Sequence, residues 1–330
     1  MGRSRAGSLR MTAVTVAIGM TVVAPTASAA PDEPPPVPYG FSSGIVAGLA
    51  APDSDPPGAN DWDCGPSLEH PDPVVLVHGF TATKTTNWQT ISPLLADAGY
   101  CVFALTYGVP PGAEFPQDQL GGFTRMEDSA AELDVFVDRV LGATGSDRVD
   151  LVGHSEGTLM PQYWLQFLGG AERTDDYVAV TPLYDGTLAD PLPVAEVADG
   201  FGVREPLAAV TGVPCEVCPQ FVSGSPYLER MNGRPGGAAV PGVTYTTVMT
   251  RYDELVVPYT SGRLDAANAT NIVVQDGCEV DVADHVSIIS TRRTGQIVLN
   301  ALDPENAVEP PCGASLPALG NEVLPGVRRP

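Results

Sequence analysis

A serine flanked by glycines lies where the sequence changes from a strand pattern to a helical pattern. The apolar run Val149–Val152 leads directly into the pentapeptide GHSEG at residues 153–157, and an amphipathic stretch begins at Thr158. A strand-to-helix turn this tight holds its central side chain clear of the sheet, while the small glycines keep strand and helix from clashing. A bare G-x-S-x-G pattern is weak evidence in a Gly-rich chain, but this context predicts that Ser155 is a nucleophile.

A serine hydroxyl becomes nucleophilic when a neighbouring base takes its proton, and the chain has four histidines for this role. His70 precedes the first predicted core strand, and His78 ends that strand, where the following backbone is needed for another task. His154 adjoins Ser155, and adjacent side chains at such a turn point in different directions. His285 lies on the loop between the last predicted strand and the last predicted helix, so elimination leaves it as the base.

The base needs a carboxylate that fixes its tautomer and stabilises the imidazolium ion. Asp253 follows the carboxyl end of a predicted strand, which is the edge where α/β sheets place ligands and catalytic groups. Glu254 is the competing acid one residue later, whereas Asp284 adjoins His285 and is poorly placed to reach the Nδ1 atom of that ring. We therefore predict a catalytic triad of Ser155, Asp253 and His285, in the chain order typical of α/β-hydrolases.

Acyl transfer also requires hydrogen-bond donors for the negative charge that develops on the carbonyl oxygen. One donor is expected to be the backbone N–H group of Glu156, at the N-terminus of the helix that follows the serine. The other should come from the loop after the first core strand, at residues 78–80, where the N–H group of Phe80 is the preferred candidate.

Unbroken apolar runs rich in β-branched residues indicate strands that are buried on both faces of a sheet. Six runs fit this pattern: Pro73–Val77, Cys101–Leu105, Val149–Val152, Tyr177–Val180, Thr244–Thr250 and Asn271–Val274. Four amphipathic stretches accompany them: Trp88–Ala98, Arg125–Leu141, Thr158–Leu168 and Val286–Leu302. Strands that alternate with helices predict an α/β fold with a mostly parallel central sheet and helices on both faces.

The N-terminal segments and the longest connection between strands indicate the domain organisation of the chain. Residues 1–29 have a basic start, an apolar run too short for a membrane span, and small residues before the expected cleavage point. This layout predicts a signal peptide and hence a secreted, extracellular protein. Residues 30–66 are rich in Pro, Asp and Gly and are expected to form an extended N-terminal arm. Residues 67–330 form the predicted catalytic domain, with a cap or lid insertion at about 181–242.

The composition excludes several classes of partner. Of 330 residues, 17 are Lys or Arg and 40 are Asp or Glu, so the formal net charge is −23. This charge excludes nucleic-acid binding through phosphate neutralisation and disfavours electrostatic docking on anionic membranes. After the signal peptide, no stretch of sequence is long and apolar enough to serve as a transmembrane anchor.

The six cysteines form an even set in a chain that is expected to be exported, so disulfide bonds are the default. The residues alone leave their pairing open. Cys215 and Cys218 have the spacing of a redox motif, but they lie among prolines with no strand before them. We expect a small structural clasp there and neither an oxidoreductase site nor a metal site, because no other ligands with zinc spacing lie nearby.

Together, these motifs resemble those of the secreted class 2 lipases of the α/β-hydrolase superfamily. The matching segments are Pro73–Phe80, Asn87-Trp88, Gly99–Val102, Val152–Gly157, Thr250–Tyr259 and Asp284-His285. They cover most of the chain from about Cys64 to Leu302, and they are specific in combination. The resemblance thins over residues 181–242, which leaves the structure of the cap and the acyl preference open.

The resemblance implies a serine ester hydrolase that cleaves acyl esters such as triacylglycerols through an acyl-enzyme on Ser155, without a cofactor. Its partners would be lipid or other acyl-ester substrates and, transiently, a lipid interface. An extracellular acyltransferase and a cutinase or polyester hydrolase are alternative functions of the same triad. Similar proteins also imply three disulfide bonds: Cys64–Cys101, Cys278–Cys312 and, as the remaining pair, Cys215–Cys218.

One residue departs from the pattern of many relatives, which carry Gln where this chain has Glu156. A carboxylate beside the triad would stabilise the protonated form of His285, which cannot act as a general base. We therefore expect either that Glu156 raises the pKa of His285 and shifts activity toward alkaline pH, or that its side chain points away and is screened or paired.

Overall fold

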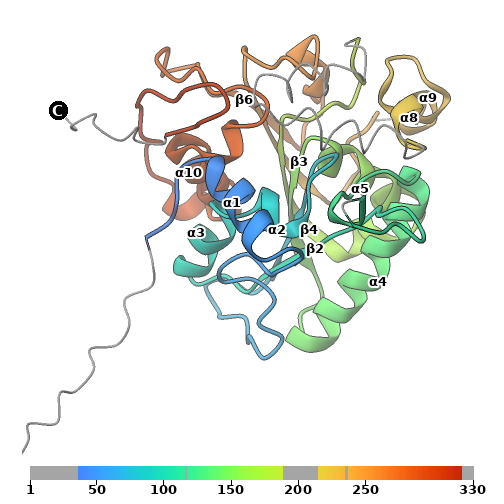
Figure 1. The fold of residues 1–330 in the computed structure, drawn as a ribbon, viewed down its shortest axis with the longest axis horizontal. Helices are drawn as coiled ribbons and strands as arrows, with labels where there is room; N and C mark the ends of the chain where they lie inside the picture. The colour runs from blue at the N-terminus through green and yellow to red at the C-terminus, as the bar shows by residue number, and fades with distance from the viewer. Residues whose placement is uncertain (1–35, 116, 189–214, 235–236, 322–330) are drawn as a thin grey trace, which may run out of the picture. The chain divides into compact units, whose positions relative to one another are not determined.

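A parallel sheet of six strands carries the predicted site in the computed structural model (Figure 1). The strand order is β2-β1-β3-β4-β5-β6, and every neighbouring pair runs in parallel. Parallel pairing brings the carboxyl ends of the strands to one edge, where the predicted catalytic segments follow β1, β3, β5 and β6. The predicted α/β class of fold is confirmed. The strands are β1 (Val74–Val77), β2 (Val102–Leu105), β3 (Val149–His154), β4 (Thr174–Val180), β5 (Thr244–Met249) and β6 (Ala269–Val273).

The structure describes residues 36–115, 117–188, 215–234 and 237–321. The predicted signal peptide lies outside these ranges, as does the part of the predicted cap from 189 to 214. The described part of the cap, inserted between β4 and β5, contains the short helices α8 (Cys218–Phe221) and α9 (Pro226–Asn232). Within the described ranges, no helix is both long and apolar enough to cross a membrane.

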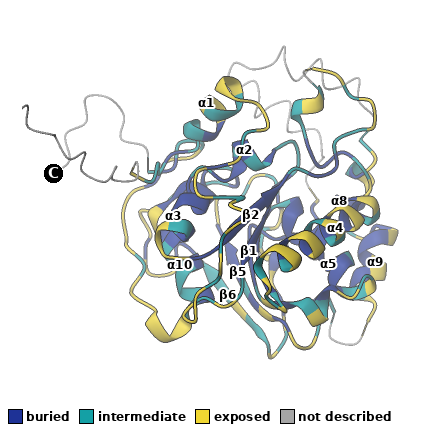
Figure 2. Ribbon diagram, turned by 90° about the horizontal axis from the view of Figure 1, so that it is seen from below, coloured by how far each residue is buried: buried dark blue, intermediate teal, exposed yellow. Residues whose placement is uncertain are grey.

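Helices cover both faces of the sheet because alternate side chains of each strand point to opposite faces. Val75 and Val77 of β1 pack on the side of α4 and α5, whereas Val74 and Leu76 pack on the side of α3 and α10. This burial on two sides explains why the strands are unbroken apolar runs in the sequence. Figure 2 shows the buried strands between the two helical layers. These layers contain α3 (Ile91–Asp97), α4 (Met126–Thr144), α5 (Glu156–Phe167) and α10 (Arg292–Leu302).

The last helix begins later than the amphipathic pattern at 286–302 predicts. Helix α10 starts at Arg292, where the side chain of Thr291 caps its N-terminus, and a 3₁₀ turn, η4 (Ile288–Ser290), precedes it. The late start leaves His285 on a loop, free of helical geometry. Other short elements are η1 (Gln117–Gln119), η2 (Gly170–Arg173), η3 (Tyr259–Gly262) and η5 (Pro304–Asn306).

The N-terminal arm, predicted to be extended over 30–66, contains a helix, so this part of the prediction is wrong. Helix α1 (Ser42–Ala50) packs against α2 (Lys84–Asn87). A Cβ atom at Gly44 would collide with the carbonyl oxygen of Thr86, so glycine is what allows the two backbones to meet. This close packing stabilises a helix in a segment whose Pro- and Gly-rich composition disfavours one.

Further along the arm, Asn60 covers the outer edge of the sheet. Its side chain donates to the carbonyl of Ala104 and accepts from the N–H group of the same residue, both at 2.9 Å. Its own backbone N–H donates to the carbonyl of Val102 at 2.9 Å. Because β2 is an edge strand, these bonds occupy backbone groups that would otherwise be open to another chain.

All six cysteines form disulfide bonds, in the pairs that the resemblance implies. One bond fastens the arm to the residue before β2, and another ties the loop that precedes His285 to the C-terminal segment. The third closes a single turn at the start of α8, which fits a structural clasp. The pairs are Cys64–Cys101, Cys278–Cys312 and Cys215–Cys218.

Candidate active site

Ser155 occupies a sharp turn between β3 and α5. Its backbone has φ 54° and ψ −120°, which is a sparsely populated conformation for a residue with a side chain. A Cβ atom at Gly153 would collide with the carbonyl of Gly157, and one at Gly157 would collide with the carbonyl of Val77. The two glycines are therefore required by the close approach of α5 to β3 and β1, and this approach holds the serine at the edge of the sheet.

The structure brings Ser155, His285 and Asp253 into one hydrogen-bonded chain. The Oγ atom of Ser155 lies 2.8 Å from Nε2 of His285. On the other side of the ring, Nδ1 lies 2.9 and 3.0 Å from the two carboxylate oxygens of Asp253. The histidine and aspartate side chains are 3% and 1% exposed, so water competes little for these bonds. With Nδ1–H donating to the carboxylate, Nε2 is left to accept the serine proton.

The neighbouring acids have other contacts. One carboxylate oxygen of Glu254 accepts from the backbone N–H of His285 at 3.3 Å. Asp284 accepts from the N–H groups of Ser287 at 2.8 Å and Ala318 at 2.7 Å, and it thereby holds the loop. In the described part of the chain, only Asp253 among these three acids is hydrogen-bonded to the ring of the histidine.

The loop after β1 lies against the serine. A Cβ atom built on Gly79 would be 3.1 Å from Cβ of Ser155, so the loop passes beside the nucleophile. Hydrogen bonds with Gly121 fix its shape: Thr81 N–H donates to the Gly121 carbonyl, and Gly121 N–H donates to the Ala82 carbonyl, each at 3.0 Å.

The two backbone groups expected to receive an oxyanion are the N–H groups of Phe80 and Glu156. Phe80 follows Gly79 in the loop beside the nucleophile, and Glu156 is the first residue of α5. Within the described ranges, neither N–H group donates to a protein acceptor. A free N–H group is the condition that an oxyanion donor must meet.

The sequence matches the family model for lipase (class 2) over residues 71–298, more than two thirds of the chain. The chain belongs to the class 2 lipase family. The matched range contains the strands β1 to β6 and all three residues of the hydrogen-bonded chain. This membership places the protein among the lipase- and esterase-type α/β-hydrolases.

A solved lipase structure shares the fold at low sequence identity. Aspergillus fumigatus lipase B superimposes with a TM-score of 0.54 at 17% identity, covering 76% of this chain and 62% of that protein. This chain therefore spans less than two thirds of the length of the Aspergillus enzyme. The mature form of Bacillus licheniformis lipase BlEst2 gives a TM-score of 0.47 at 17% identity, covering 74% and 97% of the two chains. No match is found among curated protein sequences.

His154, which the sequence analysis excluded as the candidate base, has hydrogen-bonding contacts that the sequence did not reveal. Its Nε2 atom lies 3.0 Å from the carbonyl oxygen of His285, and its Nδ1 atom lies 3.0 Å from Oδ1 of Asn87. The same Asn87 oxygen accepts from Gly79 N–H at 3.3 Å. Burial lowers the pKa of His154 to about 3, so the ring is neutral and its single N–H donates to one of these two oxygens. The ring lies between the loop that carries His285 and the segment that holds Gly79.

His78 is also structural. Its Nδ1 atom lies 2.8 Å from the carbonyl of Gly79, and its Nε2 accepts from the backbone N–H of Tyr107 at 3.2 Å. The ring stacks on that of Tyr107 with centroids 4.2 Å apart, and burial lowers its pKa to about 4. A neutral His78 therefore fixes the start of the loop that carries Gly79 and Phe80.

The pKa of His285 is set by two opposing influences. Burial of the ring lowers it, but the charge and hydrogen bond of Asp253, with additional contributions from Glu254 and Asp284, raise it above the ordinary value of 6.5. A protonated ring cannot take the proton of Ser155, so activity should rise only as the pH passes upward through this raised pKa.

Replacing Glu254 with Gln should move the acidic limb of the pH–rate profile to lower pH. The substitution removes a charge that raises the pKa of His285, while its amide oxygen can still accept from the histidine N–H. The measurement is kcat/KM against pH for the wild-type and variant enzymes. An acidic limb that stays in place would show that this carboxylate does not act on the base.

Glu156 does not act on His285 in the way that the first sequence expectation supposed. Its side chain is 0% exposed, and burial raises its pKa well above the ordinary value of 4.5, so the fold favours the uncharged form of the carboxyl group. The charges that raise the pKa of His285 come from Asp253, Glu254 and Asp284. The second expectation is met only in part: Glu156 is not among the groups that shift the pKa of His285, but within the described ranges neither of its carboxyl oxygens has a hydrogen-bond partner.

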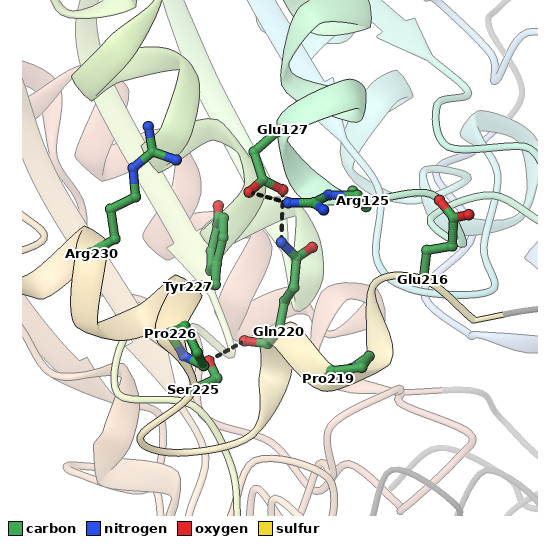
Figure 3. A pocket seen from close by; sticks show the side chains of 9 residues that line it. All are labelled: Arg125, Glu127, Glu216, Pro219, Gln220, Ser225, Pro226, Tyr227 and Arg230. Atoms are coloured by element: carbon green, nitrogen blue, oxygen red, sulfur yellow. Dashed lines mark hydrogen bonds and ion pairs between the residues drawn. The ribbon is translucent and has the colours of Figure 1, made fainter.

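A cavity of about 680 Å³ lies beside the N-terminus of α4 and the helices α8 and α9 (Figure 3). Its polar side chains pair with one another: Arg125 contacts Glu127 at 2.9 Å, and Gln220 donates to the same carboxylate at 2.7 Å. Its lining residues do not include Ser155, His285 or Asp253. Across the described residues, no cluster of three or more His, Cys, Asp or Glu side chains could hold a metal ion.

Proposed function

We propose that this protein is a secreted serine ester hydrolase, a lipase or carboxylesterase that cleaves acyl esters such as triacylglycerols through an acyl-enzyme on Ser155. The observation that carries the proposal is the continuous chain from the serine hydroxyl through His285 to Asp253, with contacts of 2.8 and 2.9 Å. This geometry suits a serine nucleophile with its general base and orienting acid.

In the proposed reaction, His285 takes the hydroxyl proton as Ser155 attacks the ester carbonyl. The N–H groups of Phe80 and Glu156 stabilise the oxyanion of the tetrahedral intermediate. The imidazolium, stabilised by Asp253, then gives its proton to the leaving alcohol, and the acyl group remains on the serine. Water, activated by the same histidine, attacks the acyl-enzyme and releases the carboxylic acid.

An aromatic cluster beside the proposed oxyanion donor supports an apolar acyl substrate. The ring of Phe80 lies 4.8 Å from that of Phe123 and 5.6 Å from that of Phe221 on α8. Phe221 belongs to the main core cluster, Phe80 packs against it and Phe123 is buried, so the loop that carries Phe80 is held on an apolar support. An acyl chain that leaves the serine toward these rings would be removed from water, which favours binding.

Secretion is part of the proposal. The three disulfide bonds suit an oxidising compartment, and residues 1–29 have the layout of a signal peptide. Transient contact with a lipid interface would follow from a triacylglycerol substrate.

Initial rates on p-nitrophenyl esters of increasing chain length, with emulsified triglyceride alongside and Ser155→Ala as the blank, test the function. We expect turnover by the wild-type enzyme only, and covalent labelling of Ser155 by a fluorophosphonate probe. Turnover by the Ser155→Ala variant at a rate near that of the wild-type enzyme would refute the proposal. Product analysis with added acceptor alcohol and release from polyester film test for acyltransferase and polyesterase activity.

A further inference from the structure

The side chain of Glu156 is a buried acid for which the proposed reaction has no use. It is 0% exposed, and neither carboxyl oxygen has a hydrogen-bond partner in the described part of the chain. Burial is the cause of its raised pKa. An ionised carboxylate in this position would lack both water and a counter-charge, so the uncharged acid is the form that the fold accommodates.

The carboxyl group lies against the segment that shapes the oxyanion loop. A Cβ atom at Gly122 would collide with its Oε2 atom and would lie 3.1 Å from its Cδ atom. The same point is 3.3 Å from Cα of Phe80, so the acid, Gly122 and Phe80 meet in one place. Gly122 has φ +78° and donates to the carbonyl of Tyr107 at 2.9 Å, which fixes it against the end of β2.

Among the residues that the structure describes, no cation contributes to the pKa of the acid, and burial is the only cause of its shift. Tyr107, whose hydroxyl donates to the His78 carbonyl at 2.8 Å, and the buried Tyr227 of α9 both respond to the charge of Glu156. The pKa of each tyrosine is raised well above 10.0, chiefly by burial. His78 beside the loop is neutral, and Asp253 carries the negative charge on the other side of the site.

We propose that Glu156 is a positioning residue: its uncharged carboxyl group supports Gly122 and the Phe80 loop in the geometry that receives the oxyanion, and its ionisation at alkaline pH disturbs that geometry. The inference rests on the proposed ester hydrolysis and deepens it. A carboxylate without a partner draws in water or shifts its neighbours, and the neighbours here carry an oxyanion donor. Its negative charge would also oppose the charge that develops on the substrate oxygen.

The test is kcat and KM from neutral to alkaline pH for the wild-type, Glu156→Gln and Glu156→Ala enzymes, with Ser155→Ala as the blank. In the wild-type enzyme, kcat should fall on the alkaline side. In Glu156→Gln, which cannot ionise, the ratio of alkaline to neutral kcat should rise by about tenfold. Glu156→Ala should lower kcat by about ten- to a hundredfold with a smaller change in KM, less than loss of a complete oxyanion donor. Glu156→Gln should recover most of that loss.

Asp150→Asn is the matched control. Asp150 is a carboxyl group of β3 that is 5% exposed and whose pKa burial also raises well above 3.8, but it lies at the opposite end of the strand from Ser155. The Asp150→Asn variant should show the same fall of kcat at alkaline pH as the wild-type enzyme. Circular dichroism at each pH separates a change in catalysis from unfolding.

The inference is overturned if the wild-type enzyme shows no alkaline fall, if Glu156→Gln keeps that fall, or if Asp150→Asn abolishes it equally. If Glu156→Ala does not fold, the pH profile of Glu156→Gln decides alone. Activity in the Ser155→Ala blank would instead refute the proposed function. An inactive blank together with an unchanged Glu156→Gln profile would refute only the role of the acid.

Discussion

Replacing Ser155 or His285 with alanine should lower kcat by about 10⁵- to 10⁶-fold, and replacing both should cause no further loss. The hydroxyl and the imidazole are 2.8 Å apart and act as one unit, since neither the attack nor the proton transfer proceeds without the other. The double variant should retain a small rate above that of water alone, because the oxyanion donors and the binding surface remain. The measurement is kcat on a soluble short-chain p-nitrophenyl ester for the two single variants and the double variant.

Two substitutions of the same kind elsewhere in the domain provide the controls. Ser129→Ala removes a buried hydroxyl from α4, where its partner is Thr124 at 3.0 Å. His70→Ala removes a ring that stacks on Tyr100 with centroids 3.8 Å apart. Both should leave kcat within about twofold of wild type, since surface and remote changes seldom act on chemistry. Losses that multiply in the double variant of the site would show that the serine and the histidine act independently.

The sheet could be predicted from the sequence because the signal is local. Each strand of a parallel sheet is buried on both faces, so runs such as Val74–Val77 are apolar at every position. The helix α1 could not be predicted in this way. Its stability comes from the contact of Gly44 with the backbone of Thr86, and the sequence of the helix itself does not encode that proximity.

The residue at which a helix begins also depends on a specific contact. The amphipathic pattern from Val286 onward continues through η4, but the capping bond of Thr291 starts α10 at Arg292. A pattern of apolar residues shows which face is buried and does not show which side chain binds the first free N–H group.

The residues of the site were predictable to the extent that their roles follow from chain order and type. Elimination among four histidines selected His285, and the turn motif selected Ser155. The environment of Glu156 was not predictable, because its burial against Gly122 depends on how a loop far away in the sequence folds over it. The role of His154 as a link between two loops depends on Asn87, which is also distant in the chain.

Asp253→Asn should lower kcat by about 10⁴-fold with little change in KM. The carboxylate receives the proton-bearing Nδ1 of His285 at 2.9 Å, and this fixes the tautomer whose Nε2 can accept the serine proton. An amide NH₂ group in the place of Oδ2, which lies 3.0 Å from Nδ1, would donate to Nδ1, so the ring would carry its proton on Nε2 and could not act as a base. The N–H groups of Leu255 and Val256, which now donate to Oδ1 at 3.0 and 2.7 Å, would keep the amide oxygen oriented toward them.

Glu254→Gln, the acid-to-amide substitution one residue later, tests whether Asp253 or Glu254 is the acid that orients His285. Glu254 contacts the backbone N–H of His285 and not its ring, so this substitution should lower kcat by less than about tenfold while it moves the acidic limb. Asp253→Asn should also move the acidic limb to lower pH, because it removes the charge and the hydrogen bond that raise the pKa of His285. If Glu254→Gln proved the more damaging of the two, Glu254 would be the acid that orients the ring during turnover, and the loop after β5 would have to rearrange when substrate binds.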